Sequence, residues 1–226
     1  MSLFSASSPQ EFIISLCIRL FIIFAVLPIH EFAHAYAAKK MGDNTAYMYG
    51  RLTLNPLSHL NVVGALSMVL IGFGWANPVP INPRNFTNYK KGVAITAFAG
   101  PLSNLICAAI GIFGIRIIEG VSLFYYSLPL YYVHIAFIYF AQINLSLAVF
   151  NLIPIPPLDG SRILSCFAPY KVVNFMNRYQ NYLYIALIAL IVADVLDRPL
   201  ILFINLFYQL FYGLFFWVVK IFELFL

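Results

Sequence analysis

The sequence predicts a mainly α-helical membrane protein: a polytopic transmembrane bundle of about five to six spans, with a small re-entrant, β-like segment near residues 45–83. Composition is the first observation. The 226 residues are 62% hydrophobic and only 9% charged, whereas a soluble domain carries about 25% charged residues. The second is a set of apolar runs long enough to cross a bilayer. We expect one integral-membrane domain over residues 1–226, with a core at about 9–165 and a C-terminal helical extension at about 180–226.

The first apolar run has the signals of a long helix. Its start, SPQE at residues 8–11, matches a capping box with proline at the first helical position. Gly42 is the predicted stop. About residues 18–38 would lie in the membrane, with Arg19 snorkelling outward. Pro28 interrupts this helix, and two interpretations stay open: a kink that the membrane helix merely tolerates, or a kink that aims the turn after it.

The next region is the predicted re-entrant, β-like segment. Residues 45–54 contain short β-like runs closed by Asn-Pro. Residues 62–75 are apolar but too short for a confident span, which favours a re-entrant element. Prolines then bias residues 76–83 to an extended form. We expect residues 45–54 or 76–83 to hold a peptide by strand addition.

Further spans are predicted at about residues 92–115, 130–152, 182–195 and 199–219. Positive charge gathers in the segments 39–91 and 162–178, which under the positive-inside rule predicts that this side is cytoplasmic. The net charge of +5 reflects these loop residues. No basic patch interleaved with aromatic residues is present, so no nucleic-acid partner is expected.

The motif HEFAH lies inside the first span. His30 and His34 are four residues apart, so both can reach one metal ion from the same helix face. Glu31 follows His30 and lies about 100° around the helix, near enough to hold a water molecule at the ion. The competing interpretation is a pair of hydrogen-bonded core histidines beside a buried, protonated glutamate. Membrane burial makes such groups costly, which favours the metal site.

A carboxylate is predicted to reach the same depth. The third span ends in the run NLIPIPPLDG, whose prolines stop the helix and place Asp159 on rigid extended backbone. This end of the span faces the predicted cytoplasmic side, as His34 does. A catalytic zinc takes three protein ligands and keeps one position open, and His30, His34 and Asp159 meet that number. His59 and His134 are not needed as ligands: we expect a loop hydrogen bond for His59, and an interface or a polar neighbour for His134.

These residues resemble the site-2 protease family of intramembrane zinc metalloproteases, peptidase family M50. The match extends to about residue 164 and points to the small bacterial and archaeal branch, a minimal form without a PDZ or CBS domain. It is carried by the runs HEFAHAYAAKKMGD, GRLTLNPLSHL, GWANPVPINPRNF, AGPLSN and FNLIPIPPLDGSRIL.

The resemblance implies a protease that hydrolyses peptide bonds in or near transmembrane segments of membrane-protein substrates. It implies one zinc ion per chain, held by His30, His34 and Asp159, with Glu31 as the catalytic base. It also suggests that Asn151 binds the substrate or the oxyanion. The implied partners are the lipid bilayer and a transmembrane protein or peptide, and the implied location is a bacterial or archaeal cell membrane, with the active site toward the cytoplasm.

Two other classes of function stay open. One is a zinc-binding membrane protein without hydrolase activity, although the presence of Glu31 argues against it. The other is a metal-ion transporter, which also uses histidines and carboxylates within the membrane. Transport predicts polar residues on both sides of the site. The outward halves of the spans are almost wholly apolar, which argues against a transport path.

Overall fold

The computed structural model describes residues 9–71, 74–121 and 127–225, and every regular element in these ranges is a helix. Contacts divide the chain into two compact units, Met1–Ser103 and Asn104–Leu226, with the boundary inside α6 (Tyr89–Gly120). Among the described residues, four helical stretches are long and apolar enough to cross a membrane: Leu16–Lys40, Tyr89–Gly120, Leu128–Asn151 and Asp197–Phe222. This confirms the predicted class, a helical membrane protein.

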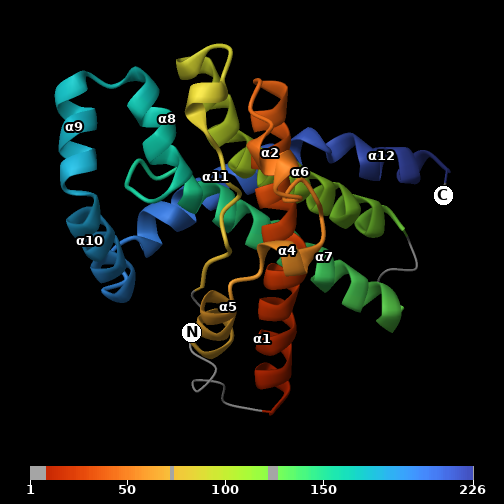
Figure 1. Cartoon of the computed structure of the whole chain (residues 1–226). Helices are drawn as coiled ribbons and strands as arrows, with labels where there is room; N and C mark the ends of the chain where they lie inside the picture. The colour runs from red at the N-terminus through yellow and green to blue at the C-terminus, as the bar shows by residue number, and fades with distance from the viewer. Residues whose placement is uncertain (1–8, 72–73, 122–126, 226) are drawn as a thin grey trace. The chain divides into compact units, whose positions relative to one another are not determined.

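The first unit is built on one long helical rod, drawn in red and orange in Figure 1. The rod consists of α1 (Pro9–Phe21), a π-helical turn η2 (Ile22–Val26) and α2 (Leu27–Lys40). The wide turn comes just before Pro28, where the proline ring would clash with the carbonyl four residues earlier. The proline is therefore accommodated by a π turn. The predicted N-cap, Ser8, lies outside the described residues.

The rod ends where the sequence predicts. The last helical residue of α2 is Lys40, and Gly42 has a φ of +107°, which suits glycine. An added Cβ at Gly42 would also lie 3.0 Å from the backbone oxygen of Asn85 and from the Thr87 hydroxyl. The end of α2 therefore packs closely against the segment that leads into α6.

A short helix lies beside the membrane part of the rod. Helix α5 (Val62–Ile71) has 10 residues and is followed by extended chain. Gly64 and Gly74 allow the returning chain to approach, because a Cβ at Gly74 would lie 2.1 Å from the Gly64 carbonyl oxygen. At about 1.5 Å per residue, this helix is too short to span the membrane and fits the predicted re-entrant element.

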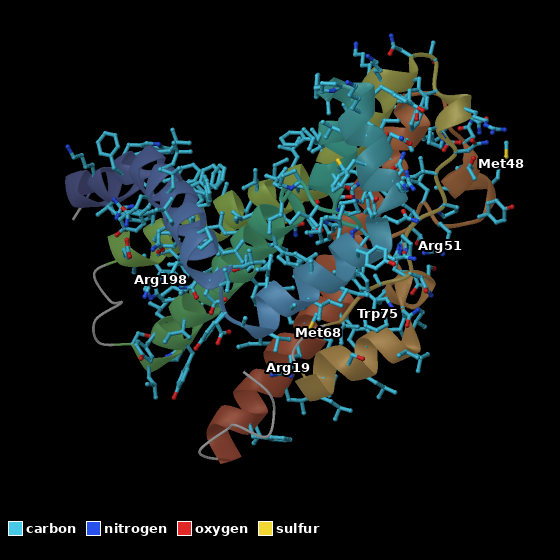
Figure 2. All side chains as sticks on the ribbon, turned by 90° about the vertical axis from the view of Figure 1, so that its left-hand side faces the viewer. Arg19, Met48, Arg51, Met68, Trp75 and Arg198 are labelled. Carbon is cyan, nitrogen blue, oxygen red and sulfur yellow. The ribbon has the colours of Figure 1, made fainter. Side chains whose placement is uncertain are left out.

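Arg19 departs from the prediction that it snorkels outward. It is buried, and its guanidinium donates hydrogen bonds to the carbonyls of Met68 and Val69 at the end of α5 (3.0 and 2.8 Å; Figure 2). The last carbonyls of a helix lack partners within the helix. A guanidinium that donates to these carbonyls inside the protein is stabilised more than one that must reach the membrane surface.

The β-like assignment of residues 45–54 is wrong for the described residues. Thr45–Met48 forms a single helical turn, α3, and a second turn, α4, covers Pro56–His59. Residues 75–82 are extended, as the prolines predict, up to the 3-10 turn η3 (Pro83–Asn85). Arg51 fastens this extended run by donating to the Asn77 carbonyl at 2.7 Å.

The second unit packs the end of α6 against α7 (Leu128–Asn151). Gly111 and Gly114 give room for Phe140 and Phe137 of α7. Asn104 donates to the Asn144 side chain at 2.9 Å, an interhelical hydrogen bond of the kind that joins helices in membranes. The remaining helices of this unit are α8 (Asp159–Phe167), α9 (Tyr170–Arg178), α10 (Gln180–Val192), α11 (Asp197–Leu214) and α12 (Phe216–Phe225). The predicted span at 182–195 corresponds to α10, whose 13 residues fall short of the roughly 20 that a span needs.

Candidate metal centre

Two buried histidines on α2 meet at the centre of the first unit. His30 and His34 are each 6% exposed. Their Nε2 atoms lie 3.0 Å apart, and the two rings are nearly perpendicular. One helical turn separates the two residues, so the sequence spacing alone directs both rings to one place. The structure therefore brings this predicted pair together.

The hydrogen bond on the other side of His34 sets its tautomer. Its Nδ1 lies 2.7 Å from the carbonyl oxygen of Thr96, on α6. A carbonyl can only accept, so Nδ1 carries the hydrogen and the Nε2 lone pair of the neutral ring points toward His30. This is the arrangement in which histidine ligates a metal through one nitrogen and is oriented through the other.

The geometry of the pair fits zinc. Two zinc–nitrogen bonds of about 2.0–2.1 Å at a tetrahedral angle place their nitrogens about 3.3 Å apart. The Nε2 atoms of His30 and His34, at 3.0 Å, need only a small adjustment to share the ion.

Gly100 creates the space beside the two nitrogens. A Cβ at this position would lie 2.3 Å from His34 Nε2 and 2.6 Å from His30 Nε2. The backbone of α6 can therefore approach the histidines only because residue 100 has no side chain. In the sequence, AGPLSN is only one of the runs that resemble the family, and nothing in it connects Gly100 with the histidines.

Glu31 points to a different neighbour from the histidines. It is half-buried, and its Oε2 accepts a hydrogen bond from the backbone N–H of Val79 at 2.9 Å. Val79 belongs to the extended, proline-rich run, so this segment lies against the predicted catalytic helix. The contact could not be predicted from sequence, because 48 residues separate the partners.

Asp43, just beyond the end of α2, is a second carboxylate that the sequence analysis did not single out. It is fully buried and accepts hydrogen bonds from the N–H and hydroxyl of Thr45, from the Asn82 N–H at 2.7 Å and from the Asn85 side chain at 2.8 Å. Burial by itself would raise the pKa of Asp43, but these hydrogen bonds together outweigh it and hold the pKa below its ordinary value. Asp43 is therefore ionised at neutral pH.

The other predicted site residues lie in the second unit. Asp159 is half-buried and is the first residue of α8, so the prediction of extended backbone at this position is wrong: the extended residue is Leu158, the N-cap of the helix. Asn151 is the last residue of α7, and its side-chain amide donates to the Leu147 carbonyl at 3.0 Å. The histidine pair belongs to the first unit, so the third-ligand role of Asp159 and the oxyanion role of Asn151 stay predictions.

The two remaining histidines have the neighbours that were predicted for them. His59 Nε2 hydrogen-bonds the Thr53 carbonyl at 2.9 Å. His134 lies 3.5 Å from the carboxylate of Glu119, in a cluster that also contains Arg116 and Tyr212.

Comparisons with known proteins agree with this geometry. A family model described as peptidase family M50 matches residues 131–193. YwhC of Bacillus subtilis (strain 168), whose name marks it as a candidate zinc metalloprotease, is 40% identical over 172 residues, covering 74% of this chain and 76% of YwhC. Rip2 of Mycolicibacterium smegmatis, named in the same way, is 28% identical over 180 residues, covering 76% of this chain and 65% of Rip2. No solved structure matches.

The relationship to YwhC extends over about three quarters of both chains, and the paired histidines have the arrangement that zinc requires. The chain therefore belongs to peptidase family M50, the site-2 protease family of zinc metalloendopeptidases.

Proposed function

We propose that this protein is an intramembrane zinc metalloprotease that hydrolyses peptide bonds in or near transmembrane segments of membrane-protein substrates. One observation carries the proposal. The two facing Nε2 atoms of His30 and His34 belong to a helical stretch, Leu16–Lys40, that is apolar and long enough to cross a membrane. A metal-ligating pair at that place in the chain fits peptide hydrolysis within the bilayer.

Asp159 is the proposed third ligand of a single zinc ion. Two histidines leave a catalytic zinc one protein ligand short. The support for Asp159 is its position directly after a proline-rich stop, in a run, FNLIPIPPLDG, that resembles the family. Its backbone begins helix α8, which fixes the side chain on ordered chain.

Zinc, when bound, supplies the Lewis acidity that makes water nucleophilic at neutral pH and polarises the peptide carbonyl. Glu31 lies beside the first histidine but off the histidine face, so it is suited to take the proton of the attacking water and pass it to the leaving amine. Asn151 is the proposed donor to the tetrahedral oxyanion. To act as this donor, the Asn151 side-chain amide must give up its present hydrogen bond to the Leu147 carbonyl.

The active site is proposed to open toward the cytoplasm. Lys39 and Lys40 are exposed at the end of α2. His34 is five residues before Lys39, which is about 8 Å along the helix axis. Under the positive-inside rule the basic end of this span lies on the cytoplasmic side. The proposed location is a bacterial or archaeal cell membrane.

The test uses purified protein in lipid vesicles with a panel of single-span substrates. Wild type and Glu31→Gln are compared for cleavage and for bound zinc. We expect one zinc in both proteins and cleavage only in wild type. Zinc binding with no cleavage of any substrate by wild type would favour a non-hydrolytic zinc protein. Zinc crossing the vesicle membrane would favour a transporter.

A further inference from the structure

The proline-rich run beside the HEFAH helix has an unusual set of backbone donors. Pro78, Pro80 and Pro83 have no N–H. Between Pro78 and Pro83, N–H groups therefore remain only at Val79, Ile81 and Asn82. Two of these three reach buried or half-buried carboxylates: the Val79 N–H donates to Glu31, and the Asn82 N–H donates to Asp43.

We propose that the Val79 N–H orients the Glu31 carboxylate and that Asp43 is the positioning residue that keeps Val79 in place. This inference rests on the proposed function, in which Glu31 is the catalytic base. The two anchors are only three residues apart in the extended run. Displacing Asn82 from Asp43 must therefore also move Val79, because an extended chain of three residues has little slack.

The Asp43 anchor is well built. Its carboxylate is fully buried and gathers donors from both sides, since Thr45 follows it in sequence while Asn82 and Asn85 come from the proline-rich segment. The Thr87 N–H adds a bond to the Met41 carbonyl at 3.1 Å. Asp43 thus ties the end of α2 to the segment that returns to Glu31 on the same helix.

The Val79 anchor is directional. Val79 is 6% exposed and packs in a cluster with Ala35 and Ala46. The side chain is held from the α2 side while the N–H faces Glu31. A hydrogen bond from a fixed N–H restricts the carboxylate, whose free side chain would otherwise sample several rotamers. A misplacement of a catalytic group by about 1 Å can cost about 100-fold in rate.

The same bonds bear on substrate binding. Strand addition along 76–83 was one expectation for how this protein holds a peptide. Two of the three free donors between the prolines are already used by Glu31 and Asp43. We therefore assign this part of the run to positioning the base rather than to pairing with substrate through its N–H groups.

The test begins with amide hydrogen exchange of the full protein in lipid, read on a peptide that spans residues 75–86. Wild type should show slow exchange at Val79 and Asn82. Glu31→Ala should release the Val79 amide alone, whereas Asp43→Ala should release both. Thr45→Val is the matched control, because it removes one donor to Asp43 and leaves the Asn82 bond. Unchanged Val79 exchange in Asp43→Ala would overturn the proposal.

Activity gives the second readout. Asp43→Ala should lower kcat about 10- to 100-fold while KM and the bound zinc stay near wild type. Asp43→Asn keeps one acceptor oxygen in place of two, so its kcat should lie between that of Asp43→Ala and that of wild type. A proportional loss of zinc and folded protein instead would show a purely structural role for Asp43.

The sharpest variant replaces the Val79 amide by an ester, using α-hydroxyvaline at that position. It removes the N–H and keeps the side chain, and it also weakens the Pro78 carbonyl, which accepts a long hydrogen bond from Arg51 at 3.4 Å. We expect the same loss in kcat, with an ester at Ile81 as the unaffected control. A rise in kcat would mean that the bond inhibits the enzyme, which contradicts the proposal. If wild type cleaves nothing, the proposed function fails, while the exchange experiment still decides whether Asp43 holds Val79.

Discussion

Gly100→Ala should weaken zinc binding while leaving the rest of the fold in place. The added Cβ would lie 2.3 Å from His34 Nε2 and 2.6 Å from both Nε2 and Cε1 of His30. Ordinary contacts of a Cβ begin near 3.4 Å, so the rings must withdraw by about 1 Å. Overpacking of a filled interior costs about 1–3 kcal/mol. If this cost applies to the ligating arrangement, zinc binding weakens about 5- to 150-fold.

The assay is the zinc dissociation constant of the purified protein, measured by competition with a chelator of known affinity. Gly213→Ala is the matched control, because it makes the same change in helix α11 where no atom lies within 4 Å of the new Cβ. Gly213→Ala should bind zinc as wild type does. Wild-type zinc affinity in Gly100→Ala would refute the conclusion that α6 closes on the two ligating nitrogens.

Three further predictions concern single side chains. His34→Ala should lose zinc, whereas His59→Ala should keep it, because His59 only hydrogen-bonds a loop carbonyl; metal analysis of both proteins distinguishes them. The pKa of Asp43 is lower in the folded protein than in the unfolded chain, so the unfolded chain binds the extra proton first as the pH falls. The stability of the fold should therefore decrease below about pH 5. Thermal unfolding should show a smaller decrease in Asp43→Asn, and an equal decrease would contradict this. Arg19→Leu should lower the free energy of unfolding by about 1.5–3 kcal/mol, because two carbonyls of α5 lose a charged donor. A denaturant titration measures this change, and an unchanged free energy of unfolding would contradict it.

The sequence was sufficient to predict the elements whose signals are local. The apolar runs, the stop at Gly42 and the i, i+4 spacing of His30 and His34 are all encoded within one or a few helical turns. The helical class is confirmed for this reason, and the structure brings the two histidines together. The extended form of residues 76–82 could also be predicted from the sequence, because proline fixes its own φ and biases the residue before it; Pro83 instead begins the turn η3.

The long-range contacts that shape the site could not be predicted from the sequence in the same way. The bonds from Val79 to Glu31 and from His34 to Thr96 join residues 48 and 62 positions apart. Their partners are backbone groups, which every residue type supplies, so no side-chain signal marks them. The β-like pattern of residues 45–54 misled for a related reason: burial of Ala46 and the bonds to Asp43 favour a helical turn there.

X-ray absorption at the zinc edge, on wild type and on Asp159→Ala, tests the central claim most directly. We predict one zinc per wild-type chain with two imidazole nitrogens at about 2.0–2.1 Å and oxygen completing the shell. Asp159→Ala should lose the ion or bind it far more weakly. Full zinc occupancy with an unchanged spectrum in Asp159→Ala, or sulfur at about 2.3 Å in wild type, would contradict the proposed centre of His30, His34 and Asp159.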